Sequence, residues 1–135
     1  MLNTFPELLN YSILAPTLLR FVLAFILITT GIEIIRPTKR ALFAAYFSTK
    51  EFPLADFIPW KLGIAQIALG VFFFFGMFTQ ISALIAIYIF FSLFYIENRA
   101  ERILPHTSAF YLVMIVISLS LLFTGAGAFA VDLPL

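Results

Sequence analysis

The most constraining feature of this sequence is a long apolar stretch, residues 58–96, that is interrupted only by a short Gly-Met-Phe-Thr-Gln segment at 76–80. As a helix, its first run, residues 58–78, covers roughly the 30 Å of a bilayer's hydrocarbon core. The second run, residues 81–96, carries no charge. Because the bilayer interior offers no water to backbone N–H and C=O groups, both runs must be helical. The stretch therefore predicts a transmembrane helical hairpin.

The composition leads to the same class of protein. Hydrophobic residues make up 63% of the chain and charged residues 11%, against about 25% charged in soluble domains. The mean hydropathy is +1.10. The absence of cysteine excludes disulfides, thiolate metal sites and iron–sulfur ligation by this chain. A net charge of +1 gives no reason to expect nucleic acid as a partner. We expect a single transmembrane domain, residues 1–135.

Two further apolar segments complete the predicted fold. One begins at Pro16, which suits the first turn of a helix, and the other follows the Pro-His-Thr segment at 105–107. The predicted spans are 16–35, 58–78, 80–97 and 108–124. Short interfacial helices are expected after a capping box at Thr4 and Glu7 and over residues 38–49. The fold class is an all-α integral membrane protein, an antiparallel bundle of four transmembrane helices.

The basic residues predict an orientation. Four spans place the connections 36–61 and 97–107 on one side of the membrane, and all but one of the eight Lys and Arg residues belong to these connections. They are Arg36, Lys39, Arg40, Lys50, Lys61, Arg99 and Arg102. The positive-inside rule places both connections in the cytoplasm and both termini outside. We expect a multi-pass protein of the bacterial inner membrane or an equivalent energy-transducing membrane.

Small residues predict where the helices pack closely. Gly63, Gln66 and Gly70 recur at i, i+3 and i+7 on one face of the second span, and Gly31 lies near the end of the first. Glycines on one face allow two backbones to approach each other within a membrane.

Arg20 lies about one turn into the first span, among large apolar residues. A buried guanidinium requires a carboxylate or several carbonyl oxygens. Antiparallel spans bring the start of the first helix and the end of the fourth to the same side of the membrane. Asp132 follows two glycines there. We therefore expect a structural ion pair between Arg20 and Asp132; the alternative is that Arg20 snorkels to the headgroups and Asp132 is hydrated.

The other end of the bundle gathers seven polar or aromatic side chains, two of which are Tyr95 and Glu97. We expect a polar or quinone-binding pocket among five of them, although Glu33 can also snorkel from the last turn of its helix. These five residues are Glu33, Gln66, Trp60, His106 and Tyr111. A lone histidine cannot supply two axial haem ligands, and no residues have metal-ligand spacing, so no metal site is expected.

The short motifs of this chain resemble those of the DoxX family. The resemblance rests on an arginine at the start of the first span, glycines in the first and second spans, Gly-x-Phe-Thr before the third, and a terminal Gly-x-Gly-x-x-x-x-Asp. These positions are Arg20, Gly31, Gly63, Gly70, Gly76 to Thr79, Gly125, Gly127 and Asp132. The chain departs from the family pattern at Gln66, where Glu is usual, at Gln80, where a basic residue is usual, and at Ala130, where Ser is usual.

The resemblance implies a four-helix membrane protein associated with membrane oxidoreductases. Its best-understood relatives are membrane subunits of thiosulfate:quinone oxidoreductase, and it provides no set of catalytic residues to transfer.

Three functions remain open. The first is a small subunit of a larger membrane complex of the redox type, contacting lipid and other subunits, with a structural or quinone-proximal role and no catalysis of its own. The second is a stand-alone quinone-binding protein or membrane oxidoreductase. The third is a transporter or channel, which four helices with few polar groups inside the membrane make hard to build.

Overall fold

Helices are the regular secondary structure of the described part of the chain. The computed structural model describes residues 14–51, 53–99, 103–104, 106–125, 127 and 130–131. Over these residues it contains five helices and no strand. The helices are α1 (Leu14–Ile35), α2 (Pro37–Ser48), α3 (Ile58–Phe75), α4 (Thr79–Arg99) and α5 (Ser108–Thr124). The helix expected after Thr4 lies outside the described residues.

Three of these helices are long and apolar enough to cross a membrane. They are α1 with 22 residues, α3 with 18 and α4 with 21. The fourth predicted span corresponds to α5, which is equally apolar but has 17 residues. The prediction of an α-helical membrane protein is thereby confirmed, whereas the fourth span stays a prediction. The surface helix expected over 38–49 is α2, which starts one residue earlier with Pro37 in its first turn.

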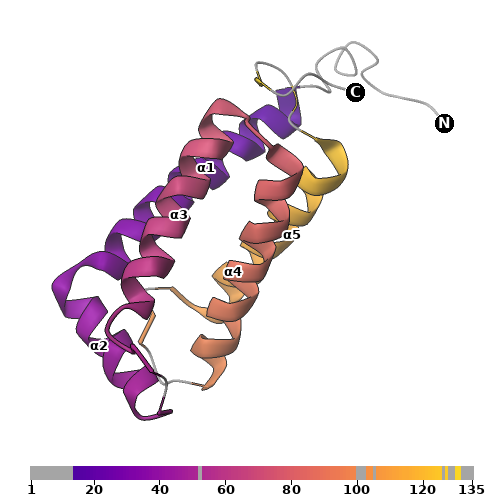
Figure 1. The fold of residues 1–135 in the computed structure, drawn as a ribbon. Coiled ribbons are helices and arrows are strands. Elements are labelled where there is room, and N and C mark those ends of the chain that lie inside the picture. The colour runs from indigo at the N-terminus through magenta and orange to yellow at the C-terminus, as the bar shows by residue number, and fades with distance from the viewer. Residues whose placement is uncertain are drawn as a thin grey trace.

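The long helices lie beside one another as two pairs. α1 runs along α3, and α4 runs along α5, with smaller contacts of α1 with α5 and of α3 with α4. α2 packs against the adjoining ends of α1 and α3 (Figure 1). We call this end, which also holds the end of α4 and the start of α5, the α2 end. The opposite end, with the α3–α4 connection and residues 125, 127, 130 and 131, is called the turn end.

The α3–α4 connection is short because a glycine ends α3. Gly76 adopts the left-handed conformation, with φ 66° and ψ 40°. Its N–H donates to the carbonyl of Phe73, and the N–H of Met77 donates to the carbonyl of Phe72. These two bonds form a Schellman motif, which satisfies the last carbonyls of the helix. α3 therefore ends at Phe75, three residues before the predicted end of the span.

α1 and α3 approach until their backbones touch. A Cβ added to Gly31 would lie 2.8 Å from the carbonyl oxygen of Gly63, and one added to Gly63 would lie 2.8 Å from that of Gly31. Two turns further along α3, a Cβ on Gly70 would lie 2.9 Å from the carbonyl oxygen of Ala24. Only glycine fits at such contacts between helices.

The large apolar side chains divide between the inside and the outside of the helices. Leu27, Phe73, Phe90 and Leu121 are buried between helices. A second set, distributed over all four long helices, is exposed: it includes Phe25 on α1, Phe74 and Phe75 on α3, Phe91 on α4 and Phe123 on α5. An exterior of this kind suits lipid, or the apolar surfaces of other membrane subunits.

The glycine contact predicts the effect of a single methyl group. Gly63→Ala should lower the free energy of unfolding by about 1–3 kcal/mol, because the methyl overpacks the α1–α3 contact. Alanine would otherwise favour the helix by about 1 kcal/mol over glycine. Thermal unfolding in mild detergent measures the difference. The control is Ala68→Leu at an exposed position of the same helix, which should be nearly neutral. A Gly63→Ala protein that is more stable than the parent would contradict this packing.

Candidate functional site

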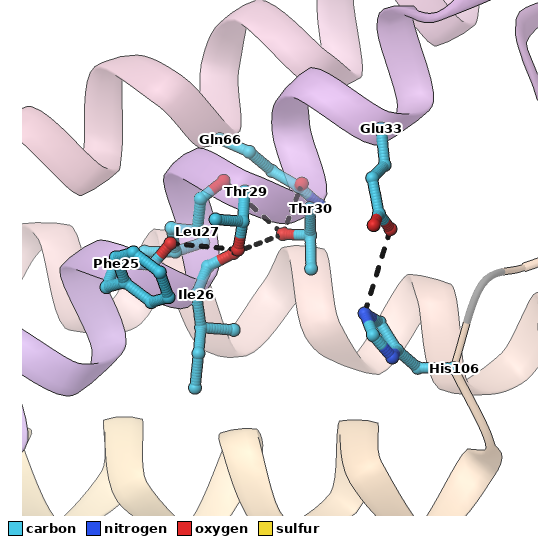
Figure 2. A network of polar contacts seen from close by, with 8 residues as sticks. All are labelled: Phe25, Ile26, Leu27, Thr29, Thr30, Glu33, Gln66 and His106. Carbon is cyan, nitrogen blue, oxygen red and sulfur yellow. Dashed lines mark hydrogen bonds and ion pairs between the residues drawn. The ribbon is translucent and has the colours of Figure 1, made fainter.

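A buried hydrogen bond joins α1 to α3 near the middle of α3. Gln66 has no exposed surface and Thr30 is 2% exposed. The Thr30 hydroxyl lies 3.0 Å from Oε1 of Gln66 and 2.8 Å from the carbonyl oxygen of Ile26 (Figure 2). A hydroxyl has one hydrogen to donate. It therefore serves either the glutamine or the carbonyl of its own helix at any moment.

The amide of Gln66 keeps unused hydrogen-bonding capacity. Its Nε2 is buried and has no hydrogen-bond partner. If the amide is turned over, Nε2 donates to Thr30 while the Thr30 hydroxyl donates to Ile26, and Oε1 then takes the unpartnered position. One end of the amide is unsatisfied in both arrangements. A buried polar group of this kind inside an apolar bundle marks a place where a further polar group would be stabilising.

Glu33 and His106 face each other about one turn beyond Thr30, toward the α2 end (Figure 2). Nε2 of His106 lies 3.8 Å from Oε2 of Glu33, and the two side chains are 35% and 37% exposed. Protonation of the imidazole turns this contact into an ion pair. The ring of His106 also stacks on Phe110, with centroids 4.2 Å apart. The histidine is thus oriented by an aromatic ring on one side and a carboxylate on the other.

Tyr111 connects this pair to α4. It is 1% exposed, and its hydroxyl interacts with the backbone of His106 and with the charges of Glu97 and Glu33. Oε2 of Glu97 is buried without a hydrogen-bond partner. Glu33, Glu97, His106 and Tyr111 therefore form a cluster of ionisable side chains at the α2 end, which we call the acid–histidine cluster. Its members come from α1, α4, α5 and, for His106, the segment just before α5.

The five residues of the expected pocket lie at three places in the structure, and the pocket itself stays a prediction. Glu33, His106 and Tyr111 come together, and Gln66 lies deeper, paired with Thr30. Trp60 is 40% exposed, and its ring lies under the guanidinium of Arg40 from α2, at 5.5 Å. The sequence analysis did not predict a role for Thr30. Its position on the same helix face as Gly31 and Glu33 could have indicated that it faces α3 and Gln66.

Tyr95 is 54% exposed and faces outward beneath Arg99, at 5.4 Å, so it is not part of the acid–histidine cluster. Among the described residues, no three His, Cys, Asp or Glu side chains are grouped so that they could hold a metal ion.

Arg20 lies at the turn end, and it has no exposed surface. A Cβ added to Gly76 would come within 2.5 Å of its Nη1 and 2.7 Å of Cβ of Ala130. The N–H of Val131 donates to the carbonyl of Phe75 at 3.3 Å. The arginine, the α3–α4 turn and residues 130–131 are therefore packed together. Asp132 lies outside the described residues, so its pairing with Arg20 stays a prediction.

The apolar helices and their enclosed polar groups define an all-helical membrane protein. The DoxX family model matches residues 15–98, which is more than half of the chain, and the protein belongs to the DoxX family. The match includes Arg20, Gly31, Gly63, Gly70 and Gly76 and ends before the terminal Gly-x-Gly segment. No match was found among curated proteins or among solved structures.

The Thr30–Gln66 pair predicts an unequal set of stabilities. Thr30→Val leaves both ends of a buried amide unpaired and should cost about 1–3 kcal/mol. Gln66→Leu should be close to neutral, because the Thr30 hydroxyl keeps its bond to Ile26. The double variant should be more stable than Thr30→Val alone. Thermal unfolding of the four proteins in detergent measures this cycle, and strictly additive effects would contradict the pairing.

Proposed function

We propose that this DoxX-family protein is a four-span, antiparallel subunit of a larger membrane complex of the oxidoreductase type. The four-span arrangement is supported by α5, whose 17 residues extend about 26 Å and which runs along α4. Flanking residues and a slightly thinned bilayer compensate for the small difference from a 30 Å core. In this arrangement α2 lies at the membrane surface.

The observation that carries the subunit proposal is the contrast between the outside and the inside of the helices. Outside, large apolar side chains are exposed on every long helix. Inside, buried polar side chains are few among the described residues, and Thr30 is hydrogen-bonded to Gln66. The apolar exterior suits contact with lipid and neighbouring subunits. The interior suits a structural subunit better than a reaction centre.

The side chains that could ligate a metal cofactor are few in this chain, which supports a role without catalysis of its own. Electron transfer requires a carrier, and the chain offers one histidine and no cysteine. It therefore cannot supply two imidazoles to a haem or thiolates to a cluster. A bis-histidine haem or an iron–sulfur cluster would have to come from a partner subunit.

A second candidate function is a quinone-binding site in or beside such a complex. It is supported by the unsatisfied amide of Gln66 and by the acid–histidine cluster one turn away. An amide N–H can donate to a quinone carbonyl oxygen, and the imidazole of His106, held by Glu33, can give or take the proton that accompanies reduction. Quinone supplies the redox chemistry when it is bound; the protein contributes orientation and protons. A transport pathway has less support, because four helices with few polar groups inside the membrane make such a pathway hard to build.

The subunit proposal predicts the result of purification from native membranes. In mild detergent the protein should migrate at a mass well above its own 15.2 kDa and carry one or more larger subunits. Deleting those partners should lower its abundance. The purified chain alone should not turn over a quinone. Catalysis by the isolated chain would overturn the proposal.

The four-span arrangement predicts the side of the membrane that each end faces. Because the chain has no cysteine, single cysteines report on accessibility without background. Ser48→Cys and Asn98→Cys, both exposed at the α2 end, should resist an impermeant thiol reagent applied to intact cells, whereas Asn3→Cys should be labelled. The reverse pattern would invert the orientation, and labelling of Asn3 and Asn98 from the same side would remove a span.

A further inference from the structure

Tyr88 is an exposed polar side chain at the centre of a membrane helix. It lies nine residues after Thr79 and eleven before Arg99, the two ends of α4. At about 1.5 Å per residue it is about 14 Å from one end and about 16 Å from the other. Its side chain is 74% exposed, on the outside of the helices.

The phenol hydroxyl has no satisfactory environment in the lipid interior. It makes no hydrogen bond to any described residue. A tyrosine side chain is about half as long as the distance to either headgroup layer, so it cannot snorkel, which is why exposed tyrosines cluster at the two interfaces. A hydroxyl without a partner in hydrocarbon is destabilising by several kcal/mol on transfer scales. The position therefore calls for a hydrogen-bonding partner from outside this chain.

The surroundings of Tyr88 form a continuous seam for a second helix. Exposed or half-exposed residues lie along one face of α4 on both sides of Tyr88, at alternating spacings of four and three residues. This spacing is typical of the contact face of two helices that form a left-handed coiled coil. The residues of the seam are Ile81, Ile85, Tyr88, Ser92 and Tyr95. Ser92 is the small member, and its hydroxyl donates to the carbonyl of Tyr88 at 2.8 Å. The seam therefore offers room beside the tyrosine, and the Ser92 hydroxyl already has its own acceptor.

We propose that this seam of α4 packs against the same seam of a second copy of this chain. A two-fold axis normal to the membrane places every residue at the depth of its counterpart. The two Tyr88 hydroxyls then meet at the same level. A phenol is both donor and acceptor, so the two hydroxyls satisfy each other.

The second copy is favoured over an unlike helix by the depth of this hydroxyl. An unlike partner would need its own polar group at the bilayer centre, whereas a second copy provides one by symmetry. The inference rests on the membrane placement of α4 and specifies one contact of the proposed complex.

Cysteine cross-linking in native membranes tests the contact while Tyr88 is kept. Ser92→Cys and Ile85→Cys place a thiol in the seam on either side of Tyr88. The matched control is Val116→Cys, which is 57% exposed near the middle of α5, away from the seam. A mild oxidant should join the first two variants into a species of twice the 15.2 kDa chain mass and leave the control as monomer. Cross-linking of Val116→Cys to the same extent, or none at the seam, would overturn the proposal.

The hydroxyl itself is tested by adding Tyr88→Phe to the Ile85→Cys chain. Interhelical hydrogen bonds in membranes are modest, so dimerisation should weaken by about threefold to tenfold while the thermal stability of the monomer is retained. Unchanged cross-linking would remove the hydroxyl from the contact. A cross-link to a different polypeptide would overturn the second copy and leave the subunit proposal standing. A dimer that carries no larger subunit would overturn the subunit proposal and leave the contact with a second copy standing.

Discussion

The contact between the backbones of α1 and α3 determines the rest of the architecture. Gly31 and Gly63 bring each helix to within a methyl group's width of the other's carbonyl oxygen. At this separation Thr30 and Gln66 can reach each other, and α2 can bridge the ends of both helices. In lipid no hydrophobic driving force favours one helix pairing over another, so the close contact that glycines permit supplies the specificity. The α1–α3 pair is then the platform on which α4 and α5 pack.

The bilayer explains why so much of the fold could be predicted from the sequence. Length, hydropathy and the requirement for internal backbone hydrogen bonds leave helices as the solution for residues 14–35, 58–75 and 79–99. The end of α3 was placed too late because residues 76–78 are as apolar as the helix itself. The left-handed geometry of Gly76, and not a change in polarity, stops the helix there.

The site was predicted less well than the fold, because the position of a residue along its helix does not determine the direction in which its side chain points. The sequence placed Glu33, Trp60, His106 and Tyr111 at one end of the bundle, but Trp60 turns toward Arg40 on the surface helix. Gln66 lies on the inward face as expected, yet it lies deeper than the others, and its partner Thr30 had no apolar pattern to mark it. Helical spacing gives the face of a residue, and only packing gives its neighbours.

The burial of Arg20 has a consequence for the order of events during synthesis. Gly76 and Ala130, which lie against its guanidinium, follow it in the chain by more than fifty and more than a hundred residues. The first helix therefore leaves the ribosome before the residues that enclose Arg20 have been synthesised. The bond from Val131 to Phe75 can form only when residue 131 has emerged. The enclosure of Arg20 at the turn end is thus a late event, which follows the synthesis of all five described helices.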